Sequence, residues 1–460
     1  MLRKLTIVLM ALVLVAVSSC AFFKNAPSPQ GNKPIPEPNL PKEDKLPKSD
    51  KEGVEENING IDINSDKRIT QSSYDEEDKR ILSLSQPEQK KLLENITYNN
   101  KNAVLHEYNT VLPVGVNNKV QYYEHVISYD YFLVTAENGA DIRESPAPDA
   151  PVVCRVNNSD KITLLQRTDG VAVQGSNIWY RVACSHENKT DQGYIHSAAG
   201  TPRSFRFDKM LAAVNLLKQE LAQGPLNYIQ NYKNQNGAPP QKGEASLDEH
   251  GYRFYHSAPA YVQADTGSSF RYIPDGMLVH ILNESGDFYY VNVPTFAGNF
   301  YVPKKYIDPA VTLSQLNQVV VVDRGQQNQA AFAVTENGLD LISYTLATTG
   351  IKGDYSFETT LGSFKAIEKK DRFEYLQKGT EKIGGYAPFA IRFTGGAYIH
   401  GVPVAYEEQN GERVDPGTTE FLQTIGTTPR SNMCVRNYTS HAKFLYDWMD
   451  TKNGAVIVIE

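Results

Sequence analysis

Two short stretches near the C-terminus hold the residue types that a nucleophilic enzyme needs. Cys434 and Arg436 lie in the run Ser-Asn-Met-Cys-Val-Arg at residues 431–436, and His400 ends an apolar run upstream. A thiol is only partly ionised near neutral pH, so it needs a base such as imidazole to take its proton, and a nearby cation favours the thiolate. These residues predict a cysteine nucleophile, Cys434, and its base, His400.

Length and composition limit what the rest of the chain can be. The 460 residues are enough for several hydrophobic cores, so we expect several modules. A hydrophobic content of 40% with 22% charged residues is ordinary for a globular protein, and a net charge of −7 gives no indication of a nucleic-acid partner. The sequence shows no metal-ligand spacing and no phosphate-binding glycine loop, so we predict no metal site and no cofactor.

The N-terminus has the pattern of an export signal. Arg3 and Lys4 precede an apolar run at residues 5–17, which is too short to span a bilayer comfortably, and residues 17–20 are Val-Ser-Ser-Cys. This layout resembles a bacterial lipoprotein signal, which implies removal of residues 1–19 and lipidation of Cys20. A plain secretory signal and an uncleaved anchor are the alternatives. All three place the body outside the cytoplasm, and the first predicts a lipid anchor in a membrane of the cell envelope.

The cysteine count fits a free thiol at the predicted site. Lipidation of Cys20 leaves three cysteines, an odd number in an export compartment where an unpaired thiol needs an explanation. Cys154 and Cys184 lie in one small module and can form a disulfide there if they are close enough, which sequence leaves open. Cys434 then stays free, as a nucleophile must.

The first half of the chain reads as a tether followed by a small β module. Residues 20–73 predict a disordered tether, because residues 24–73 contain no aromatic residue and seven prolines fall between residues 21 and 50. Residues 74–128 are weakly patterned, with one short helix expected from Ser85 onward. Residues 129–200 alternate short apolar strands with turns and predict a small β-barrel. Three motifs, at 141–146, 179–182 and 193–195, make this module resemble a bacterial SH3-like domain.

Two further elements precede the C-terminal region. Residues 201–247 predict a helix over 204–221, capped by Ser204 and stopped at Gly224, and then a linker. Residues 248–309 repeat the small-barrel pattern, with strands near 279–281, 288–293 and 300–307, and predict a second, more divergent SH3-like domain. We interpret the aromatic residues of both modules as core rather than as a binding face. The predicted fold class is mainly β.

Residues 310–460 predict an all-β body with one short helix at 440–449 and a last strand at 455–459. This region resembles the catalytic domain of the L,D-transpeptidase family. The resemblance is carried by Val-Val-Asp-Arg at 321–324, Gln-Ala-Ala-Phe at 329–332, Thr-Thr-Gly at 348–350, Thr-Thr-Leu-Gly-Ser-Phe at 359–364, Ile-His-Gly at 399–401 and the run at 431–436, in the family's order.

The resemblance implies roles for individual residues. Cys434 would be the nucleophile, His400 its base, and the backbone near Gly401 would orient the imidazole. The amides of Met433 and Cys434 would hold the oxyanion, as a tetrahedral intermediate requires. The remaining residues implied as support for the site are Ser431, Asn432 and Arg436. We expect Arg436 to brace the turn, and binding of a stem-peptide carboxylate is the alternative.

The implied reaction is acyl transfer on peptidoglycan stem peptides. Cys434 would attack the bond between the third residue, a diamino acid, and the terminal D-alanine of a stem tetrapeptide. The acyl-enzyme would pass to an amine of a neighbouring stem, giving a 3-3 cross-link, or to water, which is carboxypeptidase activity. The alternative is a lipoprotein that binds peptidoglycan without catalysis.

The region also departs from the family pattern. The family's His-Gly before the cysteine is Asn432-Met433, and the proline of its Thr-Pro motif is Thr360. His400 and Cys434 stand 34 positions apart (434 minus 400) because residues 406–426 look inserted, and we expect this insertion to form a lid. Met433 would be strained if its turn required positive φ. His441, on the following helix, is the rival to His400 as base.

Overall fold

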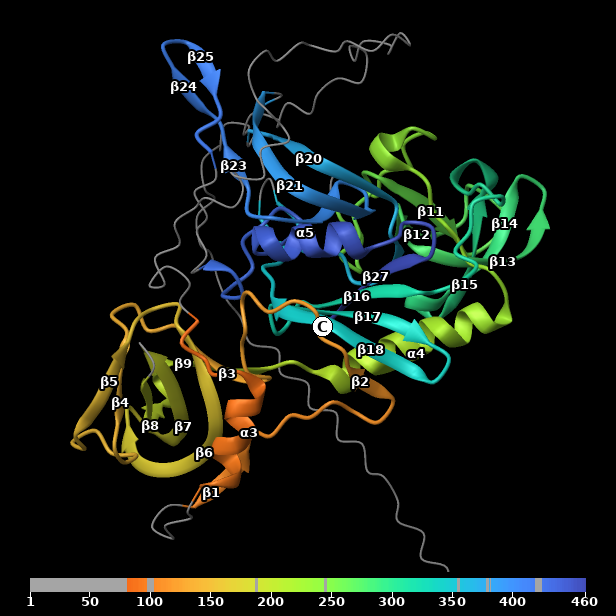
Figure 1. The fold of residues 1–460 in the computed structure, drawn as a ribbon. Helices are drawn as coiled ribbons and strands as arrows, with labels where there is room; N and C mark the ends of the chain where they lie inside the picture. The colour runs from red at the N-terminus through yellow and green to blue at the C-terminus, as the bar shows by residue number, and fades with distance from the viewer. Residues whose placement is uncertain are drawn as a thin grey trace, which may run out of the picture. The chain divides into compact units, whose positions relative to one another are not determined.

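Strands form most of the described chain, in line with the predicted mainly β class (Figure 1). The computed structural model describes residues 81–96, 103–186, 189–243, 246–353, 356–377, 380, 382–417 and 424–460, all within the unit Asn64–Glu460. Cys20, the predicted signal and the predicted tether lie outside these residues. Within them, every helix is too short or too polar to cross a bilayer.

The predicted SH3-like module is an open sheet. Its strands pair in the order β5-β4-β8-β7-β6-β3-β9, with β1 added on β6. Their bounds are β1 (Val104–Glu107), β3 (Asp130–Val134), β4 (Ala140–Arg143), β5 (Val152–Val156), β6 (Lys161–Val173), β7 (Ser176–His186), β8 (Lys189–His196) and β9 (Gly200–Ser204).

The expectation of a closed barrel was wrong for this module. Closure requires the two end strands to exchange ladder hydrogen bonds, but among the described strands β5 pairs with β4 and β9 with β3. The long strand β6 still curls the sheet, because its register against β7 slips at two places and such bulges bend a strand (Figure 1). Inside the curl, the Sγ atoms of Cys154 and Cys184 lie 2.9 Å apart.

The second module is also an open sheet, ordered β10-β13-β14-β15-β11-β12. The bounds are β10 (Asn227–Tyr228), β11 (Ser257–Tyr261), β12 (Phe270–Pro274), β13 (Leu278–Ser285), β14 (Phe288–Val293) and β15 (Gly298–Pro303), so strands occur where the sequence predicted them. The buried side chains of this sheet form one continuous core with those of the C-terminal region, including Val279, Val291, Val320 and Phe364. The two regions are therefore packed as one body.

The two helices of the first half form where they were predicted. In α3 (Gln86–Glu94), the backbone N–H of Ser85 donates to Glu88 Oε2 at 2.9 Å, which satisfies one end of the helix. The longer α4 (Phe207–Gln223) ends at Gly224, but Arg206 holds the N-cap position. The predicted cap by Ser204 was wrong, because Ser204 ends strand β9 and its hydroxyl donates to Asp130 Oδ1 at 2.5 Å.

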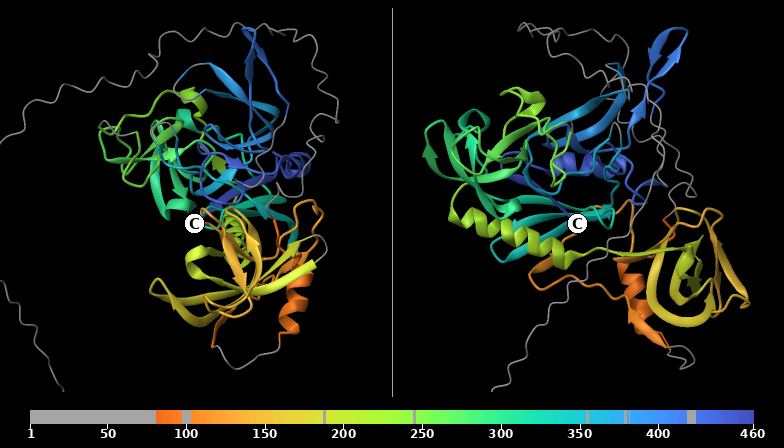
Figure 2. Two further views of the ribbon diagram at one scale, coloured as in Figure 1. Left: turned by 90° about the vertical axis from the view of Figure 1, so that its left-hand side faces the viewer. Right: turned by 180° about the vertical axis from the view of Figure 1, so that it is seen from behind.

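The C-terminal region contains two principal sheets. The first is ordered β19-β27-β16-β17-β18-β2, and the second β20-β21-β22-β26 with β23 on β21. Helix α5 (Thr439–Trp448) packs against β21 and β22, and β24 (Glu407–Gln409) pairs with β25 (Glu412–Val414) as a separate hairpin (Figure 2). The other bounds are β2 (Val116–Asn118), β16 (Gln318–Asp323), β17 (Asn328–Thr335), β18 (Gly338–Leu346), β19 (Gly362–Lys365), β20 (Glu368–Leu376), β21 (Ile383–Thr394), β22 (Ala397–His400), β23 (Val404–Ala405), β26 (Val435–Arg436) and β27 (Gly454–Ile459).

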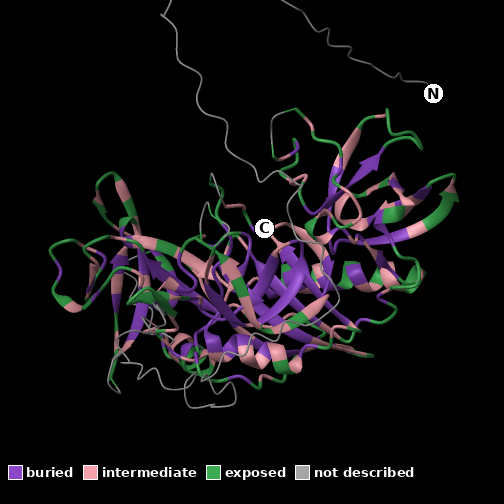
Figure 3. Cartoon of the chain, turned by 90° about the horizontal axis from the view of Figure 1, so that it is seen from above, coloured by how far each residue is buried: buried purple, intermediate pink, exposed green. Residues whose placement is uncertain are grey.

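The central strands of this region are buried on both sides (Figure 3). One face of β16 packs against α4, whose buried residues Phe207, Met210 and Val214 share a core with Val319 and Val321. The strand reads as a continuous apolar run because helix and sheet cover its two faces.

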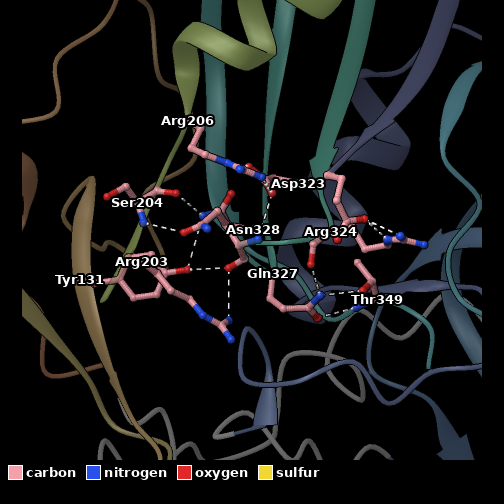
Figure 4. Close-up of polar contacts among 11 residues, drawn as sticks. Tyr131, Arg203, Ser204, Arg206, Asp323, Arg324, Gln327, Asn328 and Thr349 are labelled. Carbon is pink, nitrogen blue, oxygen red and sulfur yellow. Dashed lines mark hydrogen bonds and ion pairs between the residues drawn. The ribbon is translucent and has the colours of Figure 1, made fainter. Parts of the chain in front are cut away.

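Polar contacts fix the end of this sheet that leads to the candidate site (Figure 4). Arg206 Nε donates to Asp323 Oδ2 at 2.6 Å, so the start of α4 is tied to the end of β16. Gln327 reaches the next segment, because its Nε2 donates to Thr349 Oγ1 at 2.7 Å and its Oε1 accepts from Thr349 N at 2.9 Å. Thr349 in turn accepts, at its carbonyl, the amide of Ser431 at 3.1 Å.

Candidate active site

Strand pairing brings the predicted nucleophile and base to the same face of a sheet. β22 and β26 run parallel, with Ile399 opposite Val435 and His400 opposite Arg436. Ile399 and Val435 point into the core. Because side chains alternate along a strand, Cys434, which directly precedes β26, projects to the face that carries His400. Two residues along a strand and one strand across place their Cα atoms about 8 Å apart.

A tight turn over residues 431–434 presents the cysteine. The Ser431 hydroxyl donates to the Cys434 carbonyl and closes the turn. Thr359 braces it from the side, because its Oγ1 donates to Met433 O at 2.9 Å and accepts from Gly350 N at 2.8 Å. Asn432 Oδ1 accepts the Phe357 amide at 3.1 Å. Ser431 and Asn432 thus support the turn through hydrogen bonds.

Met433 has a positive φ of 65°, the conformation that would strain a residue with a side chain. Its amide donates to Phe357 O at 2.8 Å, so in this conformation it is not free to hold an oxyanion. That part of the predicted oxyanion pair does not fit the geometry. The amide of Cys434 makes no hydrogen bond within the described residues, and its role as oxyanion donor stays a prediction.

His400 is buried and held in one tautomer. Its Nδ1 lies 2.6 Å from the Gly401 carbonyl, which can only accept, so Nδ1 carries the proton and Nε2 keeps its lone pair. Burial lowers the pKa of His400 to about 4, against the opposing effect of the Gly401 hydrogen bond. Gly401 is itself enclosed, because a Cβ there would lie 2.9 Å from Pro388 Cγ and from Thr439 Oγ1. The Gly401 carbonyl therefore holds the imidazole by its Nδ1 in this structure.

Cys434 rests as a buried thiol. Only 6% of the residue is exposed, and Sγ lies 3.8 Å from the Gly396 carbonyl, which accepts the S–H. Burial raises the pKa of this thiol to about 11, while the Tyr398 amide and the positive charges of Arg436 and Arg253 act to lower it. No hydrogen bond joins Cys434 to His400 in the described structure. The thiol and the imidazole are both neutral at rest.

Two other residues considered in the sequence analysis, Arg436 and His441, make structural contacts. Arg436 exchanges two backbone hydrogen bonds of 2.9 Å with Thr348, which braces the turn, and its buried Nε has no acceptor within the described residues. His441 is used structurally, since Nδ1 lies 2.8 Å from Asn437 Oδ1 and Nε2 lies 3.0 Å from Ser343 Oγ. These contacts occupy both nitrogens of the rival base.

Sequence reasoning missed two supports of the turn, Thr359 and Phe357. Thr359 stands in a motif that carried the family resemblance, which was the available signal. Its contacts to residues 74 and 75 positions away could not be read from the motif.

Two regions of the chain match models of known protein families. Residues 317–459 match the model of the L,D-transpeptidase catalytic domain, and residues 138–200 match that of the bacterial SH3 domain. Residues 317–459 form an L,D-transpeptidase catalytic domain. Within this domain the family's motifs fall on β16, on the segment after β18, on β22 and on the turn before β26. The second β module, at 248–309, matches neither model and stays an SH3-like domain by prediction only.

Solved structures similar to this chain include three bacterial proteins. An L,D-transpeptidase from Stackebrandtia nassauensis has 21% identity and a TM-score of 0.23, over 31% of this chain and 56% of its own. One from Mycobacterium smegmatis has 15% identity and a TM-score of 0.24, over 39% and 80%. A fused Zn-dependent amidase, peptidase and peptidoglycan-binding protein from Clostridium acetobutylicum has 15% identity and a TM-score of 0.21, over 31% and 52%. The chain thus spans about half the length of the first and third of these. A comparison with curated proteins found no match.

Proposed function

We propose that this protein is an active L,D-transpeptidase that acts on peptidoglycan stem peptides through a Cys434 acyl-enzyme. The observation that carries the proposal is the β22–β26 pairing, which places His400 and Cys434 on one face, with His400 Nδ1 fixed by Gly401. Nε2 is left with the lone pair that a general base needs. Gly401 and the turn of residues 431–434 hold the two groups in place.

The chemistry starts from the neutral pair. As the peptide carbonyl enters, the Cys434 thiol leaves the Gly396 carbonyl and His400 Nε2 takes its proton while sulfur bonds to the carbonyl carbon. The Cys434 amide would donate to the developing oxyanion. Collapse breaks the peptide bond, and His400 returns the proton to the leaving D-alanine amine. An amine of a second stem then attacks the thioester to give a 3-3 cross-link, or water attacks it to release an acid.

The predicted export signal supports a location in the cell envelope. The proposed lipid on Cys20 would anchor the protein to a membrane, and residues 20–73, if they form the tether predicted from the sequence, would let the catalytic domain reach the nearby wall. The bacterial SH3 domain would help to dock the protein on peptidoglycan. The hairpin β24–β25 lies in the segment proposed as a lid over the site.

The second candidate is a protein that binds peptidoglycan without turnover. It is favoured by the resting state of Cys434, whose thiol is buried with a raised pKa and bonded to Gly396. Asn432 and Met433, which replace the family's His-Gly, point the same way. A carboxypeptidase differs from the transpeptidase only in its acceptor, so product analysis separates all three.

The test is incubation of the full chain with muropeptides bearing tetrapeptide stems, followed by mass spectrometry. We expect a covalent adduct on the Cys434 peptide and 3-3 linked dimers, both lost in Cys434→Ser and in His400→Gln. Cys154→Ser is the matched control and should keep both signals, because this thiol lies in the SH3 module. Release of D-alanine without dimers would replace transpeptidase by carboxypeptidase. An unmodified Cys434 with no product would overturn the enzyme proposal.

A further inference from the structure

The second β module contains one arginine whose positive charge acts on Cys434. Arg253 lies between β10 and β11, outside residues 317–459, yet its guanidinium contributes a favourable charge at Cys434. The link between the two runs through the glycine pair that connects β21 to β22. A Cβ on Gly395 would lie 2.5 Å from Arg253 Nη2, and the next carbonyl, that of Gly396, accepts the Cys434 thiol at 3.8 Å.

Arg253 forms no ion pair with the described residues, although the negative charge of Asp275 favours its charged form. Its Nη2 is buried without an acceptor among these residues. The carbon of the guanidinium lies 5.4 Å from the ring centre of Phe357, the residue that holds the amide of Met433. Burial lowers the pKa of Arg253 to about 10, so the group stays charged at neutral pH. A partly buried charge whose Nη2 has no acceptor costs free energy unless an anion arrives to pair with it.

Nearby Arg392 differs from Arg253, because its guanidinium pairs with two carboxylates. Arg392 Nη1 lies 2.7 Å from Asp275 Oδ2, and its Nε donates to Glu368 Oε1 at 2.8 Å. Asp275 also accepts the amides of Gly395 and Asn231, at 3.1 and 2.8 Å. The carboxylates of Asp275 and Glu368 therefore contact other groups directly, and Asp275 acts on Arg253 only through its charge.

The backbone that carries Arg253 is held in place. Its carbonyl accepts the Ser257 hydroxyl at 2.7 Å, and Leu247 pairs with it across a bridge. The Asp275 contacts join the same module to the β21–β22 turn. A side chain on such a fixed backbone can orient a ligand, because it loses little conformational entropy when the ligand binds.

A cavity of about 150 Å³ opens beside Arg253, and its lining includes Met433 but neither Cys434 nor His400. The lining also includes two further cations, Lys352 and Arg324, and one acid, Glu358. Arg324 forms ion pairs with Glu358, at 3.2 Å, and with Glu460. The lining therefore has an excess of positive charge. A small anionic group fits this chemistry, and a carboxylate matches the planar fork of an arginine.

We propose that Arg253 binds a carboxylate of the donor stem peptide and positions its scissile bond at Cys434. This inference rests on the proposed function and adds a specificity-determining residue supplied by the module before the catalytic domain. A stem tetrapeptide offers the carboxylate of its terminal D-alanine and, where the diamino acid has a side-chain carboxylate, a second one near the reacting bond. Either would pair with the guanidinium, and the substrate series below separates them.

The first test reads local charge and needs no turnover. Cys434 in the full chain is alkylated with anionic iodoacetate or neutral iodoacetamide, and the rate at that one peptide is followed by mass spectrometry. Arg253 should favour the anionic reagent, so Arg253→Met should lower the iodoacetate-to-iodoacetamide rate ratio by about tenfold, while Arg253→Lys keeps most of it. Arg271→Met is the matched control, because Arg271 belongs to the same module but stacks on Phe296 at 3.6 Å. An unchanged ratio in Arg253→Met, or an equal drop in Arg271→Met, would overturn the proposal.

The second test identifies the carboxylate. Tetrapeptide substrates are prepared with a free or amidated terminal D-alanine and with a free or amidated diamino-acid carboxylate. Wild-type protein should prefer one free acid by at least tenfold in kcat/KM, mainly through KM, and Arg253→Met should lose that preference while Arg253→Lys recovers part of it. A preference that survives in Arg253→Met would refute the assignment. Absence of turnover by the wild type would count against the proposed function, and the alkylation ratio would still decide the place of Arg253.

Discussion

The left-handed conformation of Met433 predicts an unusual order of stability among its variants. Met433 has φ +65°, while its side chain is 3% exposed and belongs to the central core. Removing the side chain should cost about 2–5 kcal/mol in either Met433→Ala or Met433→Gly, because the two cavities differ only by the alanine Cβ. The two variants differ in the backbone. Alanine keeps the strain of a left-handed residue, about 1–2 kcal/mol, and glycine does not.

We therefore expect Met433→Gly to be more stable than Met433→Ala by about 1 kcal/mol, roughly a fivefold difference in the unfolding equilibrium constant. Met449 provides the matched control. It is 1% exposed in the same core, but its φ is −72°. There glycine only adds backbone freedom to the unfolded chain, so Met449→Gly should be less stable than Met449→Ala by about 0.5–1 kcal/mol.

The assay is equilibrium unfolding in guanidinium chloride, followed by tryptophan fluorescence. The chain has two tryptophans, and a Trp179→Phe background leaves Trp448, which packs at the end of α5 against the core that contains Met433. All four variants are compared in this background. A Met433→Ala protein as stable as Met433→Gly would refute the idea that this turn stores backbone strain.

Three further predictions follow from the same geometry. Gly401→Ala should reduce acylation of Cys434 by about 100-fold, measured by the rate of adduct formation, because its Cβ would meet Pro388 at 2.9 Å and displace the carbonyl that orients the base. Burial lowers the pKa of His441 from 6.5 to about 3. As pH falls below 6.5, His441 is therefore protonated in the unfolded chain but not in the folded one, and the free energy of unfolding decreases. His441→Gln should flatten that fall by roughly 1 kcal/mol per pH unit in unfolding experiments between pH 6.5 and 4.5. Cys154 and Cys184, with sulfurs 2.9 Å apart, should form a disulfide in oxidising buffer, visible as a linked peptide pair in non-reducing mass spectrometry and absent in Cys154→Ser.

Local patterns were enough to predict most elements. Short apolar runs located β14, β16 and β27, and the i, i+3, i+4 spacing located α4, because these patterns extend over only a few residues. The motif around His400 and the run at 431–436 led to the two residues that the β22–β26 pairing brings to one face. The condition stated for strain at Met433, a positive φ, is met in the structure.

Features that depend on distant partners could not be predicted in this way. Strand β20 forms a long hairpin with β21 and places Phe373 beside Tyr398, although its own sequence is mostly polar. The hydrogen bond from the Met433 amide to the Phe357 carbonyl joins residues 76 positions apart (433 minus 357). The charge of Arg253 acts on Cys434 from another module. Such pairings are decided by packing of the whole chain, which no window of sequence records.

The short strand β2 has a consequence for how the chain must assemble. It pairs in parallel with β18, Val116 opposite Leu339, and so completes the edge of the catalytic sheet from a position 223 residues earlier (339 minus 116). In the sequence, the whole bacterial SH3 domain thus lies between two strands that pair in one sheet. During synthesis β2 emerges long before its partner exists, and closing so large a loop is slow. The catalytic sheet reaches its finished edge only after the SH3 domain and β18 have both been made.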